Sequence, residues 1–193
     1  MKKLLVLDLD QTLIQSSELP IDDYHFIYRT GYSTVWIKKR PGLDNFLSEI
    51  FDLYDVAIWS YGTDDYVKLI IQAIAPTYDF VFIWTRKRCT LRRISNVECN
   101  LDTGMPQNTY HIKKLSKIWR KRTNNYNKYN TVVIDDTPIT YINNYGNAIP
   151  IKEYNGQTYD LEFDIILKIL NKLIAYDNVR LGLKNIKQIS RPP

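Results

Sequence analysis

The sequence contains no run of about eighteen apolar residues, the length that a membrane-spanning helix requires. Its N-terminus also lacks the pattern of a secretory signal peptide, because Met1-Lys2-Lys3 is followed by a short stretch that reaches Asp8 at once. We therefore expect a soluble protein that is neither secreted nor bound to a membrane, and that acts in the cytoplasm, the nucleus or both.

Cysteine and histidine are both scarce. The chain has two cysteines, Cys89 and Cys99, and two histidines, His25 and His111. The histidines do not stand at zinc-ligand spacing from the cysteines. We therefore expect free thiols in a reducing compartment rather than a disulfide or a zinc site.

The length and the charge of the chain set broad limits. Its 193 residues and 45% hydrophobic fraction suffice for one packed core. We expect a single domain over residues 1–193, with an insert at about residues 89–110 and a flexible tail at about residues 185–193. The net charge of +5 suits anionic partners such as phosphoproteins or nucleic acids, but charge alone does not choose between them.

Short apolar runs alternate with helical stretches along most of the chain. The runs are continuous, which is typical of strands that are buried on both faces of a parallel sheet. The predicted strands are Leu4–Leu7, Val56–Trp59, Phe80–Trp84, Thr131–Ile134 and Ala148–Ile151. The predicted helices are Leu43–Leu53, Asp64–Ile74 with Thr63 as N-cap, His111–Lys121 and about Asp160–Tyr176. This order predicts right-handed crossovers and an open α/β sheet.

Two segments do not fit this alternation. His25–Arg40 is rich in tyrosine and threonine and has Gly31 near its middle, which predicts a β-hairpin flap. Thr90–Tyr110 is polar, contains Gly104 and Pro106, and interrupts one crossover. We interpret this second segment as a small β-rich insert.

Carboxylates follow two of the predicted strands. Asp8 and Asp10 come after the first strand, and Asp135 and Asp136 come after Ile134. Open α/β sheets bind ligands at the carboxyl ends of their strands, so these acids should lie together. Such groups repel one another unless a cation lies among them, and hard oxygen ligands suit Mg²⁺. Each pair alone could simply begin a turn or cap a helix, but their joint occurrence favours a site.

Two more residues could contact a phosphate at this edge. Ser60 follows Val56–Trp59 and precedes a helix, so its hydroxyl and nearby backbone N–H groups could hold a phosphate oxygen. Lys113 stands at the start of a predicted helix and could neutralise a phosphorylated aspartate. Both have an ordinary alternative, because a serine before a helix is usually a cap and a lysine, such as the neighbouring Lys114, is usually solvated.

The order of these residues resembles the four signature motifs of the haloacid dehalogenase superfamily: Asp-x-Asp-x-Thr, a strand-end Ser, a Lys and an Asp-Asp pair. More narrowly, the chain resembles the small-phosphatase branch of the RNA polymerase II C-terminal-domain (CTD) phosphatases, the NLI-interacting-factor-like family. The similar segments are Leu4–Ser17, Lys39–Leu47, Arg86–Cys89, Ile112–Ser116, Ile134–Pro138 and Asn147–Ile151. The resemblance implies a Rossmann-like haloacid dehalogenase fold: a central parallel sheet flanked by helices, with a β-hairpin flap, a small β-rich insert and no large cap domain.

The resemblance also implies roles for single residues. Asp8 matches the nucleophile that becomes an aspartyl phosphate. Asp10 matches the general acid that protonates the leaving alcohol and later activates water. Thr12 and Ser60 match the groups that orient Asp10 and hold a phosphoryl oxygen, and Lys113 matches a lysine that stabilises charge.

The implied cofactor is Mg²⁺. Asp136 matches its direct ligand, joined by the Asp8 carboxylate and the Asp10 backbone carbonyl. Asp135 matches the acid that pairs with Lys113 and supports the metal site. Positive charge clustered in this way stabilises the transition state of phosphoryl transfer.

Three positions concern the substrate. Arg86 matches an arginine of the family's insert that lies beside the substrate phosphate. Glu18, in contrast, stands where the small CTD phosphatases have an aromatic residue that helps to hold a substrate proline, and Lys114 replaces an acidic residue. An acid at position 18 removes apolar contact area and repels a second phosphate, so the chemistry is better supported than the polymerase-tail substrate.

These residues predict a Mg²⁺-dependent phosphoric monoester hydrolase that acts on Ser/Thr phosphoproteins, with the RNA polymerase II CTD as one candidate substrate. The basic stretches Arg86–Arg93 and Lys113–Arg122 could guide an acidic phosphopeptide, or could form an ordinary solvated face. A polynucleotide 3′-phosphatase, which would bind nucleic acid directly, is an alternative. A catalytically silent binding module is a third, less favoured because the whole catalytic set is present.

Overall fold

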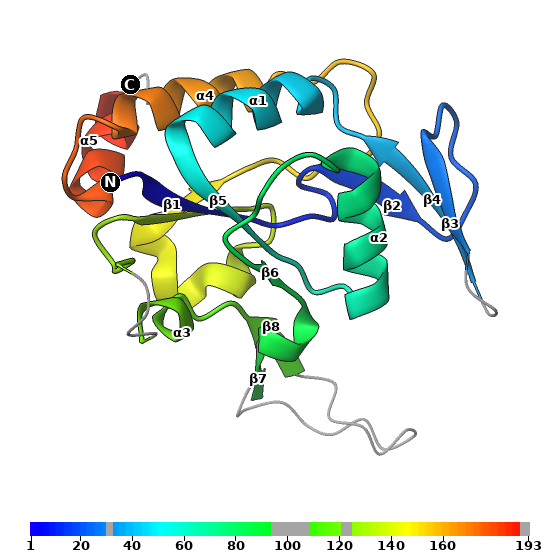
Figure 1. Ribbon diagram of the computed structural model, residues 1–193, viewed down its shortest axis with the longest axis horizontal. Helices are drawn as coiled ribbons and strands as arrows, with labels where there is room; N and C mark the ends of the chain where they lie inside the picture. Colours follow the sequence, from blue (N-terminus) through cyan, green and yellow to red (C-terminus); the bar gives the residue numbers. More distant parts are fainter. Residues whose placement is uncertain (30–32, 94–108, 121–124, 190–193) are drawn as a thin grey trace.

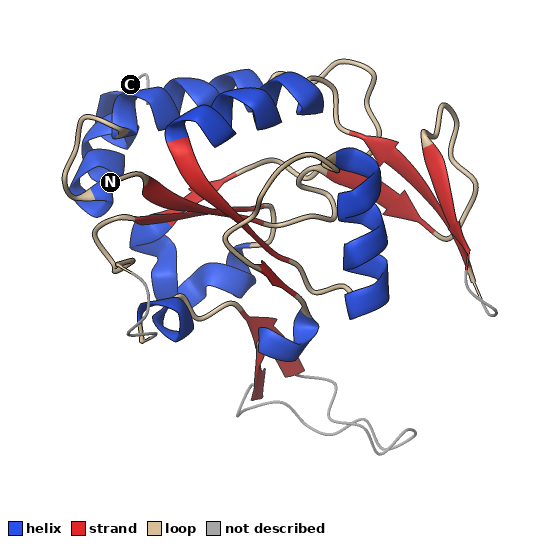
Figure 2. Ribbon diagram, in the orientation of Figure 1, coloured by secondary structure: helices blue, strands red, loops and turns tan. Residues whose placement is uncertain are grey.

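The computed structural model describes residues 1–29, 33–93, 109–120 and 125–189. Its centre is a five-stranded sheet in the order β10-β9-β1-β5-β6, in which all neighbouring strands are parallel (Figure 2). These strands are β1 (Lys3–Leu7), β5 (Tyr54–Trp59), β6 (Ile83–Trp84), β9 (Thr131–Asp135) and β10 (Ala148–Pro150). The prediction of an open, parallel α/β sheet is therefore confirmed.

The central strands are apolar on both faces because both faces are covered. Successive side chains of a strand point to opposite faces. Accordingly, Leu5 and Leu7 of β1 belong to one apolar core, whereas Leu4 and Val6 belong to a second. All four side chains are fully buried, which explains why the sequence shows an unbroken apolar run here.

Within the described ranges, four helices contribute to the first core: α1 (Leu43–Leu53), α2 (Asp64–Ile74), α4 (Glu162–Leu173) and α5 (Val179–Ile189) (Figure 1). The second core is closed by α3 (Ser116–Trp119) and the 3-10 segment η2 (Pro138–Asn147). Both α1 and α2 have the predicted bounds. The predicted N-cap is also confirmed, because Thr63 Oγ1 accepts a hydrogen bond from the backbone N–H of Tyr66 at 3.3 Å.

A three-stranded antiparallel sheet extends beyond the carboxyl end of β1 (Figure 1). It contains β2 (Ile14–Ser17), β3 (Phe26–Arg29) and β4 (Thr34–Lys39) in the order β2-β4-β3. The predicted hairpin flap corresponds to β3 and β4 and is confirmed. The sequence did not predict β2, which joins this flap directly to the turn after β1.

A smaller antiparallel sheet stands at the base of the predicted insert. In it, β7 (Thr90–Arg93) pairs with β8 (Thr109–Ile112), and the 3-10 turn η1 (Arg86–Arg88) precedes β7. Residues 94–108, which make up the rest of the predicted insert and include Cys99, lie outside the described residues. Cys89, at the end of η1, is a free thiol as predicted.

The predicted helix from His111 to Lys121 is wrong over its first part. His111 and Ile112 belong to β8, where Ile112 pairs with Thr90, and the described helix is the single turn α3. Residue 121 lies outside the described residues. The predicted strand Phe80–Trp84 is also shorter than expected, because β6 contains only its last two residues.

The C-terminal tail also differs from what the sequence predicted. The tail expected from about residue 185 begins inside α5, which was not predicted and which runs to Ile189. Val179, Leu183 and Ile186 of this helix are buried in the first core, so packing holds it in place. No helix within the described ranges combines the length and the apolar character that crossing a bilayer would require.

Candidate active site

The predicted site residues meet at the carboxyl edge of the central sheet. β1 lies between β5 and β9, with Leu7 in register with Ile58 and Ile134. The backbone N–H of Asp8 donates to the Ile134 carbonyl at 3.0 Å, which holds Asp8 beside the end of β9. Ser60 follows β5 at the same edge. Parallel strands thus bring together residues that lie far apart in the sequence, at the place where open α/β sheets bind ligands.

The turn after β1 is held in one conformation by distant segments. Gln11 has a φ of +55°, in the left-handed region that residues other than glycine rarely adopt. Its carbonyl accepts a hydrogen bond from the backbone N–H of Tyr154 at 2.8 Å. The carbonyl of Thr12 accepts one from Arg40 Nη1 at 3.0 Å. These contacts fix the turn that carries Asp10 and Thr12.

Lys113 bridges two of the acids. Its Nζ lies 2.5 Å from Asp8 Oδ1 and 2.7 Å from Asp135 Oδ2, and all three residues are buried. Burial lowers the pKa of Lys113, but the charges of Asp8 and Asp135 outweigh this effect and raise the pKa above its ordinary value. Lys113 is therefore an ammonium ion that can neutralise negative charge beside Asp8.

The acidic groups around Lys113 suit a divalent cation. One carboxylate oxygen from each of Asp8, Asp135 and Asp136 lies within 4.8 Å of the others. Three carboxylates against one ammonium leave two negative charges in this cluster. Burial raises the pKa of Asp8, and Asp135 adds to the rise while Lys113 opposes it. A cation bound here would favour the ionised form of Asp8, and the all-oxygen donor set fits Mg²⁺.

Thr12 contacts this cluster. Its Oγ1 lies 3.2 Å from Asp136 Oδ1 and 3.5 Å from Asp8 Oδ2. The resemblance implies that Thr12 helps to orient Asp10, whereas its hydroxyl contacts two acids of the predicted metal site, Asp8 and Asp136. Of the predicted pair, only Ser60 contacts Asp10.

Asp10 is held by hydroxyl groups rather than by cations. Ser16 Oγ donates to Asp10 Oδ1 at 2.8 Å, the Tyr66 hydroxyl donates to the same oxygen, and Ser60 Oγ lies 3.5 Å from Oδ2. Burial and then the charge of Asp10 raise the pKa of Tyr66, so its phenol is a donor at neutral pH. The sequence predicted Ser60 but neither Ser16 nor Tyr66. Ser16 lies within a segment that resembles the family, while Tyr66 has no local signal.

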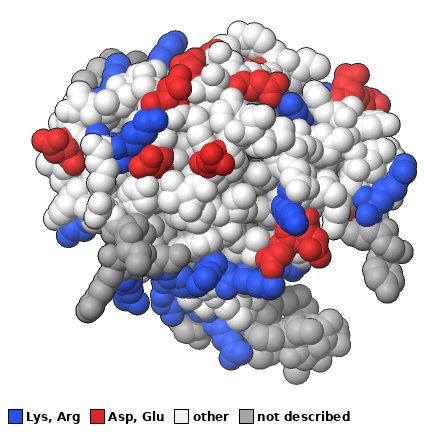
Figure 3. Space-filling view, viewed as in Figure 1, with Lys and Arg blue, Asp and Glu red and all other residues white. Residues whose placement is uncertain are grey.

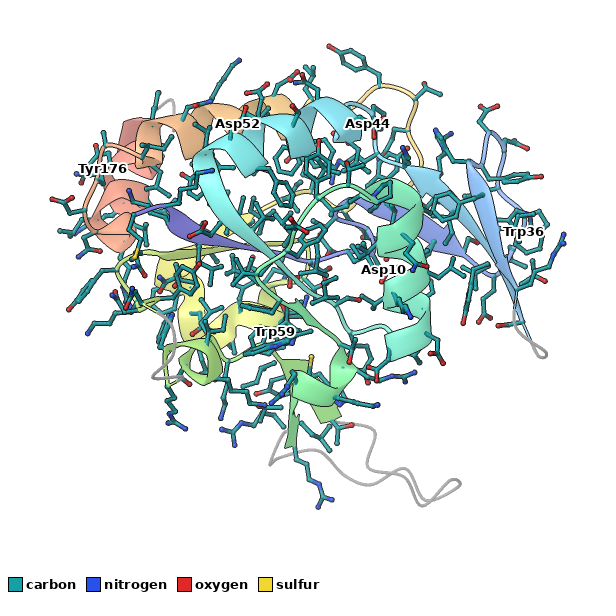
Figure 4. The ribbon with its side chains drawn as sticks, in the orientation of Figure 1. Asp10, Trp36, Asp44, Asp52, Trp59 and Tyr176 are labelled. Carbon is teal, nitrogen blue, oxygen red and sulfur yellow. The ribbon has the colours of Figure 1, made fainter. Side chains whose placement is uncertain are left out.

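A cavity of about 570 Å³ that opens to solvent is lined by Asp8, Asp10, Ser16, Tyr66 and Lys113, whereas Thr12 and Ser60 are buried and are not part of its lining. Figure 4 labels Asp10 beside α2 and Trp36 farther out, on the flap. The flap contributes Ser16 and Val35 to the lining, and η2 contributes Ile139 and Thr140. The lining also includes His111 and Tyr61, whose ring centroids are 4.5 Å apart.

Lys113 and Arg86, the other two predicted residues, differ in how they relate to the cavity. Lys113 directly follows β8 instead of beginning a helix, and η2 positions it, because its backbone N–H donates to the Thr140 carbonyl at 2.6 Å. Arg86 is exposed on η1 and is not part of the cavity lining. Its backbone N–H donates to the carbonyl of Gly62, which does line the cavity, so Arg86 adjoins the rim.

Known proteins are similar to this chain in sequence over nearly its whole length. The relative named Phosphatase Herzog of Drosophila melanogaster is 28% identical, over 97% of this chain and 48% of its own. A probable C-terminal domain small phosphatase of Dictyostelium discoideum is 29% identical, over 94% and 54%. The CTD small phosphatase-like protein of Homo sapiens is 26% identical, over 92% and 58%. The chain thus spans about half the length of the curated relatives it matches.

A solved structure and a family model complete the comparison. The RNA polymerase II CTD phosphatase Fcp1 of fission yeast has a TM-score of 0.56 at 21% identity, over 97% of this chain and 55% of that one. This likeness confirms the predicted Rossmann-like haloacid dehalogenase fold. The model of the NLI interacting factor-like phosphatases matches residues 3–180. Because that match covers most of the sequence, the chain belongs to the NLI interacting factor-like phosphatase family.

Proposed function

We propose that this protein is a Mg²⁺-dependent phosphatase in which Asp8 becomes transiently phosphorylated. The observation that supports this most directly is the buried contact of Asp8 with Lys113, at 2.5 Å, next to Asp135 and Asp136 at the end of β9. A carboxylate so placed, at the floor of an open cavity, can attack the phosphorus atom of a monoester.

The reaction then has two steps. In the first, an Asp8 oxygen forms a bond to phosphorus, the bond from phosphorus to the alcohol oxygen breaks, and Asp10 gives its proton to that oxygen. In the second, Asp10 removes a proton from water and the water oxygen attacks phosphorus. The bond between phosphorus and the Asp8 oxygen breaks, which releases inorganic phosphate and restores Asp8. Lys113 stabilises the charge on Asp8 and on the phosphoryl group, and the Ser60 hydroxyl can hold a phosphoryl oxygen.

Asp8, Asp136 and the Asp10 backbone carbonyl would hold Mg²⁺, with Asp135 in support. The bound ion would supply positive charge to the phosphoryl oxygens in both steps. The residues fit this ion because oxygens of Asp8, Asp135 and Asp136 lie within 4.8 Å of one another and carry more negative charge than Lys113 neutralises. Thr12 orients two of these acids through its contacts with Asp8 and Asp136.

The proposed substrate is a phosphorylated serine or threonine side chain of a protein. The cavity opens to solvent between the flap and η2, so an extended peptide can reach Asp8. Relatives that are named as CTD small phosphatases agree with this substrate class and make the RNA polymerase II CTD a candidate. Glu18 lines the cavity, where its charge would disfavour a second phosphate nearby.

Basic residues beside the cavity support an acidic partner. Figure 3 shows Lys and Arg gathered in the region where Figure 1 labels β7, β8 and α3. Desolvation and repulsion from Arg92, Lys117 and Arg120 lower the pKa of Lys114, which follows Lys113 in the chain. Within the described ranges, Arg92, Lys114 and Arg120 form no ion pair. Together with Arg86 at the rim, these cations can attract a negatively charged peptide.

A substrate comparison tests the proposal. The wild type should release phosphate from a phosphoserine peptide when Mg²⁺ is present and not when it is chelated, and Asp8→Asn should abolish this activity while the circular dichroism spectrum stays unchanged. Hydrolysis that survives Asp8→Asn would remove Asp8 from the nucleophile role. Preference for a 3′-phosphorylated oligonucleotide would instead indicate a polynucleotide 3′-phosphatase, and no hydrolysis of either substrate would indicate a silent binding module.

A further inference from the structure

We infer that Tyr66 is a positioning residue for Asp10, because its hydroxyl and that of Ser16 hold one carboxylate oxygen of Asp10 in place and leave the other facing the leaving group. The inference rests on the proposed function, in which Asp10 is the general acid. It concerns a helix residue that no sequence motif of the chain marks.

The two oxygens of Asp10 have different surroundings. Oδ1 accepts hydrogen bonds from both Ser16 Oγ, at 2.8 Å, and the Tyr66 hydroxyl. Oδ2 has one long contact, 3.5 Å from Ser60 Oγ. These two hydrogen bonds hold Oδ1 in place, since a carboxylate oxygen offers about two acceptor sites. Oδ2 is therefore the oxygen that is left to face a leaving group in the cavity.

The position of the Tyr66 ring is fixed by its neighbours. Tyr66 lies in the first turn of α2, where its backbone N–H is bonded to the Thr63 cap at 3.3 Å. On one side the ring packs edge-on against Tyr28 of the flap, with ring centres 5.6 Å apart. On another side Gly62 leaves room for it, since a Cβ at this position would lie 2.7 Å from the ring. These contacts direct the hydroxyl at Asp10 and prevent it from behaving as a freely rotating surface group.

Such a role has a distinct kinetic consequence. A general acid matters most when the leaving group is a strongly basic alkoxide, as in phosphoserine, and matters little when a nitro-substituted phenolate leaves. Loss of the Tyr66 hydroxyl frees Oδ1 and lets the Asp10 side chain rotate away from the leaving group. The hydrolysis of phosphoserine should therefore be slowed selectively, whereas a merely structural defect would slow all substrates together.

The test compares the wild type with Tyr66→Phe in Mg²⁺, using a phosphoserine peptide and 2,4-dinitrophenyl phosphate. For the peptide we expect kcat/KM, which reports the first step alone, to fall about tenfold or more, as befits the loss of a hydrogen bond to a charged group. For the aryl phosphate we expect kcat/KM to stay within about twofold, because its leaving group needs no proton in that step. Ser16→Ala should change the ratio of the two rates in the same direction.

The matched control is Tyr28→Phe, which removes a tyrosine hydroxyl from the neighbouring ring and should leave both rates unchanged. An equal loss on the two substrates, or an unchanged rate on the peptide, would overturn the inference while the proposed function stands. If Tyr66→Phe does not fold, Ser16→Ala decides by the same ratio. A wild type that hydrolyses neither substrate would refute the proposed function, and this inference with it.

Discussion

Arg40 connects the turn after β1 to the last third of the chain, so its ion pair should be essential for stability. Its side chain is fully buried and faces Asp160, whose two carboxylate oxygens accept from Nε at 3.1 Å and from Nη2 at 2.9 Å. Further guanidinium N–H groups donate to the carbonyls of Thr12, at 3.0 Å, and Lys152, at 2.9 Å. One side chain thus joins three separate segments.

The change Asp160→Asn keeps the shape of the partner but removes its charge. The guanidinium then remains buried with no carboxylate beside it among the described residues, and breaking a buried pair from one side costs about 3–5 kcal/mol. Native domains have about 5–15 kcal/mol of stability in total, so this loss is a large fraction. Arg40→Lys should cost a similar amount, because a single ammonium cannot reproduce the bidentate contact and both carbonyl contacts.

Urea unfolding followed by the fluorescence of the four tryptophans measures this loss. Asp44→Asn is the matched control, because it makes the same chemical change in an exposed pair with Lys39 at 3.0 Å. We expect the control to lose no more than about 1 kcal/mol. Equal losses for Asp160→Asn and Asp44→Asn would show that the buried guanidinium is solvated in solution, and would refute the reasoning.

Three other changes test the surroundings of the site. Gly62→Ala places a Cβ 2.7 Å from the Tyr66 ring, so urea unfolding should show a loss of about 1–3 kcal/mol. Mg²⁺ should raise the thermal midpoint of the wild type but not that of Asp136→Asn, and equal shifts would place the ion elsewhere. Lys114→Ala should raise KM for an acidic phosphopeptide about twofold to fivefold at low salt, with kcat unchanged. Lys168→Ala, on the exposed side of α4, should leave KM as it is.

The parts of the fold that were predicted correctly depend on local signals. The strands β1, β5 and β9 are unbroken apolar runs, and α2 begins at a threonine cap. The second half of β8, His111 and Ile112, was predicted as helix because its strand character comes from pairing with β7, more than fifteen residues earlier in the chain. The helix α5 was missed although Val179, Leu183 and Ile186 recur at helical spacing, and it gains stability from burying them in the first core.

The site residues also differ in how far the sequence could predict them. Asp8, Ser60 and Asp136 were predictable because each follows a strand, and the order of parallel strands places their ends side by side. Tyr66 was not predictable, since its contact with Asp10 joins residues 56 positions apart, on a helix and a turn. Ser16 was missed for a related reason, because it reaches Asp10 only when β2 folds back into the flap.

The two aspartates after β1 are chemically identical, and the structure gives them different partners. Asp8, at the end of the strand, lies against the Lys113 ammonium and the acids at the end of β9. Asp10, on a turn forced by the left-handed Gln11, is surrounded by neutral hydroxyl donors. Lys113 offsets the negative charge that Asp8 needs in order to attack phosphorus, while the hydroxyl groups around Asp10 orient that side chain without adding charge. Exchanging the roles would place the proton donor against an ammonium that opposes its protonation, so the surroundings favour Asp8 as nucleophile and Asp10 as acid.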